Sequence, residues 1–299
     1  MDYYRRSISG NIRACRVATM KTRILHISDL HFGPPFVPAV AEALLRSIPA
    51  LEPDTVVISG DLTQRAKRQQ FEQARDFFKR LPDVPHLVIP GNHDVALWRV
   101  FERLIRPHAL YREYISPELN PVLHVGNVVM VGLDSTSPRR SISNGRIDRR
   151  QLQYAAEAFA DASPDKVRIV VAHHHFAPGH DRVYDISMPG SKRAIDSFVD
   201  QRVEMILGGH LHRSYIGNSL NFFSGHHRDR GVIIVQCGTT TSSRGKGSER
   251  DENTFNLIEA SEETLTVTHF LYYEREGKFA PLSKHVFPRP GRPFRVGLP

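Results

Sequence analysis

The chain has 299 residues, of which 40% are hydrophobic and 9% aromatic, so it can bury a full core in one large domain or two small ones. Its two cysteines, Cys15 and Cys237, exclude a disulfide-stapled fold and indicate a reducing, cytoplasmic compartment, and no apolar run approaches the roughly 18 residues of a membrane span. The net charge of +8 lies mainly at the two ends of the chain, so nucleic acid is a possible partner but not the favoured one.

Residues 1–20 are predicted to form a disordered basic tail. The segment before Met20 contains four arginines against one aspartate and has no apolar core, so it does not have the pattern of a secretory signal. An alternative is that the native protein starts at Met20.

The first half of the chain alternates between short apolar strands and amphipathic helices. The expected strands cover residues 22–27, 54–59 and 85–90, and the expected helices cover residues 37–48 and 65–80. Similar polar residues follow the three strands at steps of 61 − 29 = 32 and 92 − 61 = 31 residues. This spacing is typical of consecutive βαβ units, which place all three strand ends at one edge of a parallel sheet.

The second half is less regular. Its expected elements are a hairpin over residues 121–133, a helix over 148–160 capped by Asp148, a strand over 167–172, a helix over 191–200, and strands over 203–207, 231–237, 254–260 and 265–271. We therefore expect one domain over residues 21–273. A basic, Pro- and Gly-rich C-terminal tail over residues 274–299 should follow it, with little fixed structure from Pro288 onward.

Five short polar segments directly follow predicted strands. They are Asp29-x-His31, Gly60-Asp61, Gly91-Asn92-His93-Asp94, His173-His174-His175 and Gly209-His210-x-His212. Carboxylate, amide oxygen and imidazole together suit divalent cations such as manganese, iron or zinc. Seven ligands drawn from these segments would be too many for one tetrahedral ion, but they fit two ions that share a carboxylate.

A single segment of this kind is more often ordinary turn chemistry than a metal site. Five of them in order at strand ends favour a site. Residues outside the segments receive simpler interpretations: His26 as a core or surface histidine with its hydrogen bonds satisfied, Trp98 as a packing residue, and His226-His227 as part of a solvated loop.

The five segments resemble the pattern D-x-H, G-D, G-N-H-[DE], H and G-H-x-H of the calcineurin-like metallophosphoesterases. The resemblance runs from about Lys21 to about Leu271. It implies an α/β fold, a four-layer αββα sandwich of two mixed sheets. Within the family, residues 27–32 and 238–244 are most similar to the class III cyclic-nucleotide phosphodiesterase branch.

The resemblance also implies which residues hold each metal ion. Asp29, His31 and His212 would hold the first ion, and Asp61 would bridge to the second.

The second ion would be held by Asn92, His210 and one histidine of the triplet. Family members often have proline shortly after this histidine, whereas here the triplet runs into Phe176. His173 is favoured because it directly ends the apolar strand, and His174 is the alternative.

By the same resemblance, His93 would face the phosphate and assist the departure of the leaving oxygen, with Asp94 orienting its ring. The implied function is that of a binuclear-metal-dependent phosphoesterase. It would hydrolyse a cyclic nucleotide or a similar small phosphodiester by attack of a metal-bridging hydroxide. The alternatives are a nuclease or nucleotide-sugar pyrophosphatase of the same superfamily and a non-catalytic scaffold. No oligomeric state is predicted.

Overall fold

Two mixed β-sheets of six strands each form the centre of the molecule. The structure is a computed structural model that describes residues 21–139, 143–177, 187–223, 231–245 and 252–290. The predicted tail over residues 1–20 and the predicted loop at His226-His227 lie outside these residues.

The first sheet has the strand order β12-β11-β10-β1-β2-β3. Its strands are β1 (Thr22–Ile27), β2 (Thr55–Ile58), β3 (His86–Val88), β10 (Thr254–Ala260), β11 (Thr264–Tyr273) and β12 (Lys278–Pro288). Strands β1, β2 and β3 run parallel, and β10, β11 and β12 continue the sheet antiparallel from β1. The carboxyl ends of β1 to β3 therefore lie at one edge, as their spacing predicts.

The second sheet has the strand order β4-β5-β6-β7-β9-β8. Its strands are β4 (Val122–Val125), β5 (Val128–Gly132), β6 (Val167–Val171), β7 (Met205–Gly208), β8 (Tyr215–Asn218) and β9 (Ile233–Gln236). The four inner strands β5, β6, β7 and β9 are parallel, and β4 and β8 pair antiparallel at the two edges.

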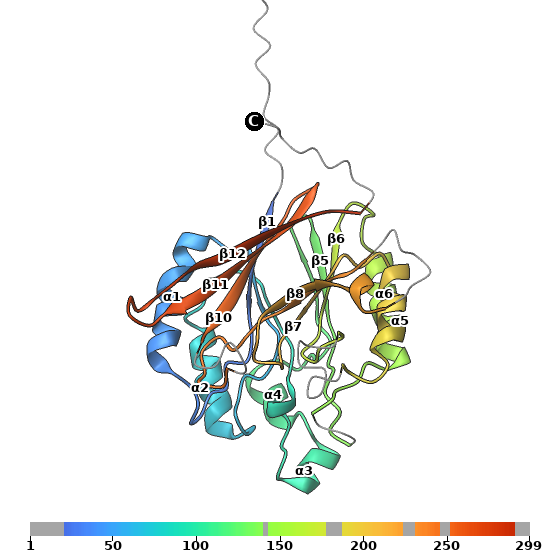
Figure 1. The fold of residues 1–299 in the computed structure, drawn as a ribbon. Coiled ribbons are helices and arrows are strands. Elements are labelled where there is room, and N and C mark those ends of the chain that lie inside the picture. The colour runs from blue at the N-terminus through green and yellow to red at the C-terminus, as the bar shows by residue number, and fades with distance from the viewer. Residues whose placement is uncertain (1–20, 140–142, 178–186, 224–230, 246–251, 291–299) are drawn as a thin grey trace, which may run out of the picture.

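Helices cover the outer face of each sheet (Figure 1). The helices are α1 (Pro38–Leu51), α2 (Arg68–Phe78), α3 (Val100–Ile105), α4 (Ala109–Tyr114), α5 (Arg149–Ala160) and α6 (Ser191–Asp200), with short 3₁₀ turns at Asn92–Asp94 and Ser219–Asn221. One buried cluster joins α1, α2 and α4 to the first sheet, and another joins α5 and α6 to the second. No helix in the described part of the chain has both the length and the apolarity needed to cross a bilayer.

A third buried cluster fills the space between the two sheets. Alternation along each strand divides its side chains between the layers: Val56 and Ile58 of β2 pack against the helices, whereas Val57 points at the other sheet. Because both faces of the inner strands are buried, these strands are almost wholly apolar in sequence. The four layers αββα of the predicted fold class are confirmed.

Most predicted elements are found within a few residues of their expected bounds, and the Asp148 side chain caps α5 by accepting from the Gln151 amide. The tail predicted from residue 274 is wrong in its first part, because Lys278–Pro288 forms the edge strand β12. An edge strand tolerates the Pro281 and the polar side chains that suggested a tail. The interpretation of Trp98 as a packing residue is also wrong, since its side chain is 75% exposed.

A chain of buried polar side chains crosses the first sheet. His26, Asn256 and His269 are paired in register on β1, β10 and β11. His269 Nδ1 lies 2.8 Å from Asn256 Oδ1, Asn256 Nδ2 lies 3.4 Å from His26 Nδ1, and His26 Nε2 lies 2.9 Å from Ser59 Oγ. His26 is therefore a core histidine with both ring nitrogens paired, and the chain ends at the carboxyl end of β2.

This polar chain predicts that acid destabilises the fold. Burial lowers the pKa of His26 to about 3 and that of His269 to about 4, against 6.5 for an unfolded histidine. Between these values the unfolded chain binds more protons than the folded one. Stability is therefore complete above about pH 6.5 and falls as the pH drops toward 4, by up to about 1.4 kcal/mol per pH unit for each histidine.

His269→Gln should flatten this dependence, because the glutamine amide can still donate to Asn256 but does not titrate. Urea unfolding of the metal-free protein at about pH 7.5 and about pH 5 measures the two slopes. Equal losses of unfolding free energy in the variant and the wild type would show that His269 takes no part in the acid response.

Candidate metal centre

The five polar segments follow β1, β2, β3, β6 and β7, and their loops continue the hydrogen bonding of the parallel strands. The amides of Asp29 and His31 donate to the carbonyls of Gly60 and Asp61 at 3.1 and 3.0 Å. In the second sheet, the Gly209 amide donates to the His173 carbonyl at 3.1 Å. The loops are thus held side by side, and their side chains converge where the two sheets meet.

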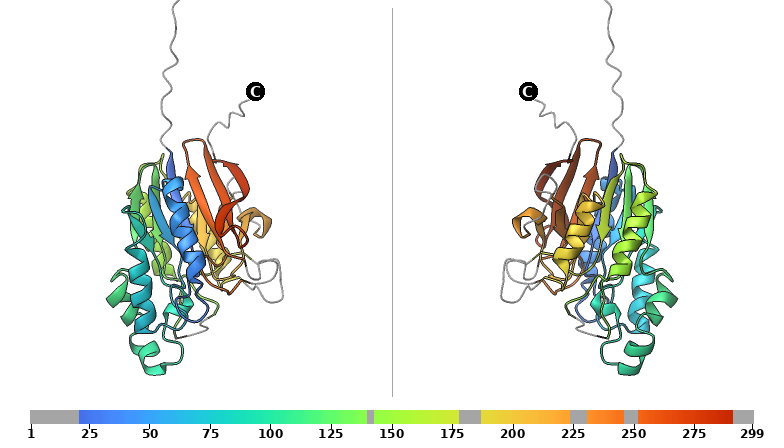
Figure 2. Two further views of the ribbon diagram at one scale, coloured as in Figure 1. Left: turned by 90° about the vertical axis from the view of Figure 1, so that its left-hand side faces the viewer. Right: turned by 90° about the vertical axis from the view of Figure 1, so that its right-hand side faces the viewer.

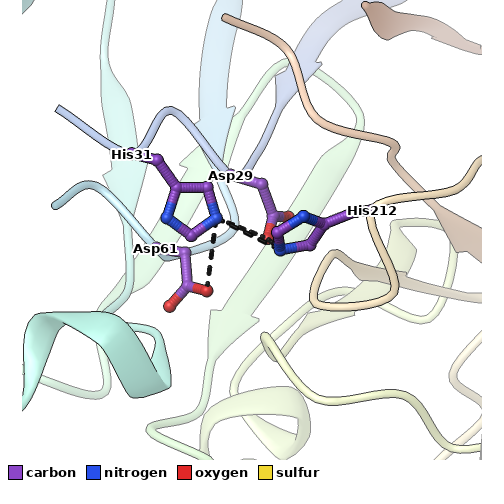
Figure 3. A group of neighbouring side chains, drawn as sticks. All are labelled: Asp29, His31, Asp61 and His212. Carbon is purple, nitrogen blue, oxygen red and sulfur yellow. Dashed lines mark hydrogen bonds and ion pairs between the residues drawn. The ribbon is translucent and has the colours of Figure 1, made fainter. Parts of the chain in front are cut away.

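One group of side chains brings together Asp29, His31, Asp61 and His212 (Figure 3), each at most 2% exposed. Their potential ligand atoms all lie within 4.8 Å of one another. His31 Nε2 is 3.1 Å from His212 Nε2, and His212 Nε2 is 3.2 Å from Asp29 Oδ1. Nitrogen atoms and carboxylate oxygens that face one another at such distances have the arrangement of ligands around one cation.

A second group lies beside the first and shares Asp61. Asn92 Oδ1 is 2.9 Å from His210 Nδ1 and 3.2 Å from His173 Nε2. Asp61 Oδ2 is 3.3 Å from His173 Nε2 and 3.7 Å from His31 Nε2, so this oxygen stands between the two groups. The neighbouring His174 turns its Nδ1 to the Ser135 hydroxyl at 2.8 Å, a geometry that favours His173 over His174 as the ligand.

Each of the two aspartates has one oxygen fixed by the protein and one directed at the centre. Asp29 Oδ2 accepts from the Ser28 hydroxyl and the His210 amide, and Asp61 Oδ1 accepts from the His93 amide. The other two oxygens, Asp29 Oδ1 and Asp61 Oδ2, are buried and accept no hydrogen bond from the described residues. A buried carboxylate oxygen without a donor is costly unless a cation satisfies it, so the residues present fit bound metal.

Backbone carbonyls fix the orientation of two of the histidine rings. His173 Nδ1 donates to the Ser59 carbonyl, and His212 Nδ1 donates to the Arg244 carbonyl, both at 2.8 Å. Each bond leaves the Nε2 lone pair directed at the centre, which is the usual way in which proteins prepare a metal-binding histidine.

The backbone at the site is strained. Eight non-glycine residues in the described ranges have positive φ, and five of them carry the candidate ligands Asp29, His31, Asp61, His210 and His212, with φ of 51–73°. A left-handed conformation costs roughly 1 kcal/mol or more for such residues, and strain of this kind gathers at functional sites. The concentration of strain at these five positions is independent support for a site.

Two glycines are required because ligand side chains lie against their backbone. A Cβ at Gly91 would lie 2.2 Å from Asp61 Oδ1, and one at Gly209 would lie 2.3 Å from Asp29 Oδ2. The glycines of the Gly-Asn-His-Asp and Gly-His-x-His segments therefore make room for the two carboxylates.

The buried charges depend on one another. Burial opposes ionisation of Asp29 and Asp61, but the surrounding histidines outweigh it and hold the pKa of both carboxyls well below the usual range. Burial lowers the pKa of His31 to about 4. Burial also disfavours the charged form of His173, yet the adjacent Asp61 carboxylate raises the pKa of His173 to about 9. A proton on His173 thus occupies the position beside Asp61 that a cation would take.

A family model described as calcineurin-like phosphoesterase matches residues 22–214, the part of the chain that contains all seven candidate ligands. The chain belongs to this family. The predicted family is confirmed, and with it the expectation of a metal-dependent phosphoesterase.

Relatives of the calcineurin-like chain include two proteins named as phosphodiesterases. A probable cyclic nucleotide phosphodiesterase of Synechococcus is 27% identical over 219 residues, which cover 69% of this chain and 80% of that protein. A probable glycerophosphodiester phosphodiesterase, GpdQ, of Arcobacter nitrofigilis is 29% identical over 168 residues, which cover 54% of this chain and 58% of that protein.

Among solved structures, a purple acid phosphatase from yellow lupin seeds superimposes with a TM-score of 0.69 at 12% identity, over 91% of this chain and 55% of the lupin chain. At this identity the likeness shows the fold alone. This chain spans little more than half the length of the lupin protein and of the Arcobacter relative.

His93 lies at the rim of the calcineurin-like centre. Its ring is 4.9 Å from that of His31 between centroids, and its Nδ1 donates to the Gln64 carbonyl at 2.9 Å. Its Nε2 is 3.3 Å from Arg244 Nη1, which also donates to Gln64 Oε1 at 2.9 Å. A histidine nitrogen and an arginine therefore meet at the edge of the two groups of candidate ligands.

The role predicted for Asp94 needs correction, because Gln64 and not Asp94 holds the His93 ring. Asp94 Oδ1 accepts from the amide and hydroxyl of Thr63, and Oδ2 accepts from the amides of Leu62 and Gly91. Asp94 thus ties the loop after Asp61 to the loop before Asn92. Burial and the nearby Asp61 charge raise the pKa of Asp94 to about 7.

Asp94→Asn is therefore expected to weaken the scaffold of the site. An asparagine offers one oxygen where the loop presents donors on two sides, so the side-chain NH₂ group of the introduced asparagine would face a backbone N–H. The free energy of unfolding should fall by about 1–3 kcal/mol, and metal affinity should fall roughly 10–100-fold. Denaturant unfolding and metal titration measure both effects. Unchanged stability with an altered preference for leaving groups would mean that Asp94 acts on His93 after all.

Sequence reasoning did not single out Gln64 and Arg244 as functional residues. Gln64 holds the His93 ring through its backbone carbonyl, which any residue type carries, and only its contact with Arg244 uses the side chain, so residue type gave no signal for its role at His93. Arg244 belongs to the polar segment after β9, whose approach to His93 depends on the order of strands in the second sheet. The sequence signal that could have indicated a role for Arg244 was its position directly after a Gly/Ser/Thr-rich stretch at the end of a strand.

Proposed function

We propose that this chain is a binuclear metal-dependent phosphodiesterase acting on cyclic nucleotides or similar small diesters. The observation that carries the proposal is the position of Asp61 Oδ2 between two ligand groups, one with Asp29, His31 and His212 and the other with Asn92, His173 and His210. A carboxylate shared in this way supports two neighbouring ions.

The seven side chains of these two groups would hold manganese, iron or zinc, the metals that carboxylate, amide and imidazole ligands suit. When bound, a pair of such ions supplies Lewis-acid stabilisation of the phosphoryl oxygens and a nucleophile at neutral pH. The complete donor set supports an enzyme over the alternative of a non-catalytic scaffold.

The residues at the rim supply binding and proton transfer. Arg244 carries a fixed positive charge and points its Nη1 toward His93 Nε2, so both groups can reach a phosphate oxygen placed beside the centre. With a proton on each ring nitrogen, His93 would give the proton on Nε2 to the departing oxygen and keep the proton on Nδ1, which the Gln64 carbonyl would hold through that transfer. A cavity of about 110 Å³ lined by residues that include Gln64, Asn92, His93 and Leu97 adjoins these groups.

The names of the two relatives support a diester as substrate, one a cyclic nucleotide and the other a glycerophosphodiester. The choice between them can be made with a substrate panel. Protein stripped of metal and reconstituted with Mn²⁺, Fe²⁺ or Zn²⁺ should bind two ions per chain and regain activity. It should hydrolyse cyclic AMP, glycerophosphocholine or bis(4-nitrophenyl) phosphate faster than 4-nitrophenyl phosphate or a single-stranded oligonucleotide.

Each other outcome of this panel contradicts part of the proposal. Two bound ions with no hydrolysis of any substrate would favour the scaffold. Preference for the oligonucleotide or for a nucleotide sugar would favour the nuclease or pyrophosphatase alternative. Full activity with one ion per chain would exclude the shared role of Asp61.

A further inference from the structure

The segment around α3 exposes a cluster of large apolar side chains that the phosphodiesterase function does not use. Their exposed fractions are 75% for Trp98, 50% for Val100, 84% for Phe101, 42% for Leu104 and 69% for Ile105. We refer to these five residues as the α3 face. No residue of α3 is buried in the core of the described structure. A contiguous exposed apolar cluster of this kind is typical of an interaction site.

The α3 face is continuous with the mouth of the candidate active site. In Figures 1 and 2, α3 lies at the lower end of the molecule, beyond the ends of the strands that carry the metal ligands. The cavity that contains Asn92 and His93 is also lined by Arg65 and Leu97, and Leu97 directly precedes the face. The Arg65 guanidinium is 6.0 Å from the centre of the Trp98 ring.

Arginines outnumber acidic residues in and beside the face. Among the described residues five arginines lie within it or beside it, and the one acidic residue of residues 98–105, Glu102, is paired with Arg99 at 2.5 Å. These arginines are Arg65, Arg99, Arg103, Arg106 and Arg139. Arg103 donates to the Leu97 carbonyl and Arg139 to the Leu104 carbonyl, at 3.1 Å each, which fixes both beside the apolar side chains.

This composition selects one occupant. In a symmetric dimer the same patch meets itself, so the arginines of one copy would lie against the arginines of the other. An anionic phospholipid surface instead offers hydrocarbon to the aromatic and aliphatic side chains and phosphates to the arginines. A short helix that projects from the molecule can also insert its apolar side chains between lipid headgroups.

We propose that the α3 face docks this protein on anionic phospholipid surfaces, with the mouth of the site at the level of the lipid headgroups. The inference goes beyond the proposed phosphodiesterase function and does not depend on it.

The chain provides its own reporter, because Trp98 is its single tryptophan. Full-length protein is mixed with vesicles of phosphatidylcholine alone or of phosphatidylcholine with phosphatidylglycerol. Docking should shift the Trp98 emission to shorter wavelength and sediment the protein with the anionic vesicles. The neutral vesicles should have a much weaker effect, and added salt should weaken the anionic binding.

Two matched double substitutions distinguish binding through the α3 face from non-specific hydrophobic adsorption to vesicles. Phe101→Ser with Ile105→Ser should weaken vesicle binding at least roughly tenfold. Leu282→Ser with Val286→Ser, on β12, removes two exposed apolar side chains outside the face (54% and 51%) and should not weaken it. Circular dichroism and hydrolysis of a soluble nitrophenyl diester should be unchanged in both double variants.

Three results would overturn the proposal. The first is an unshifted Trp98 emission in the presence of anionic vesicles. The second is equal vesicle binding by wild type and by the Phe101→Ser, Ile105→Ser variant. The third is a concentration-dependent blue shift without lipid, accompanied by dimers in light scattering, which would mean that a second copy of the chain covers the face.

Discussion

Asp61→Asn should reduce phosphodiester turnover by more than the roughly 10²–10³-fold that loss of a single oxyanion-hole donor costs. The substitution keeps an oxygen to accept from the His93 amide but replaces the oxygen that stands between the two ligand groups with a neutral amide. Metal content per chain should fall with the rate. Steady-state hydrolysis of bis(4-nitrophenyl) phosphate and elemental analysis of the purified variant measure both.

The same substitution should lower the unfolding free energy of the metal-free protein while leaving it folded. Asp61 is fully buried, but the surrounding histidines hold its pKa well below the usual range, so the ionised carboxylate stabilises the fold and its loss leaves His173 without that charge beside it. Asp54→Asn is a matched control at the opposite, exposed end of the same strand and should keep full activity. Near-wild-type turnover in Asp61→Asn would contradict the binuclear mechanism.

His93→Ala should lower turnover roughly 10²–10⁴-fold on substrates with poor leaving groups while leaving metal content unchanged. The alanine keeps the backbone amide that holds Asp61, and the lost ring contacts Gln64 and Arg244 and no candidate ligand by hydrogen bond. A ribose oxygen needs a proton as it departs, whereas nitrophenolate leaves almost unaided. The loss should therefore be far larger on cyclic AMP than on a nitrophenyl diester.

The control for His93→Ala is His86→Ala at the other end of β3. Within the described part of the chain, the His86 ring forms a hydrogen bond only with the Pro82 carbonyl. His86→Ala should keep both activities. Equal losses on the two substrates in His93→Ala would contradict the role of His93 in protonating the leaving group. Loss of a metal from this variant would show that His93 is a ligand.

The sequence was sufficient to predict the parallel strands and the loops that follow them, because both have strong local signals. The strands β1, β2, β6 and β7 are buried almost throughout and therefore mainly apolar, and each is followed by a polar segment with glycine, aspartate or histidine. The edge strands β8 and β12 lacked this signal. An edge strand is half in solvent, so β12 carries lysines, serine and proline in a pattern that local reasoning assigns to a tail.

The positions of the candidate ligands could be predicted, but their hydrogen-bond partners could not. Residue type and strand ends suffice to propose Asp29, Asp61 and Asn92. The hydrogen-bond partner of the His93 ring depends on which nearby loop directs a carbonyl toward it. The direction of that carbonyl depends on the backbone conformation of the loop, which includes left-handed residues, and not on residue type. The adjacent Asp94 was the natural guess from sequence, yet its carboxylate is used to cap backbone amides.

The division of ligands between the two sheets means that bound metal would act as a cross-link. Asp29, His31, Asp61 and Asn92 come from the first sheet, and the remaining candidate histidines come from the second. His31 and His212 are 181 residues apart in the chain. Closing a loop of that length costs conformational entropy. Ions that remain bound would restrict the unfolded chain and so stabilise the fold, as a disulfide does. Neither half of the chain contains a complete set of donors, so tight metal retention should appear only late in folding, after the sheets have packed together.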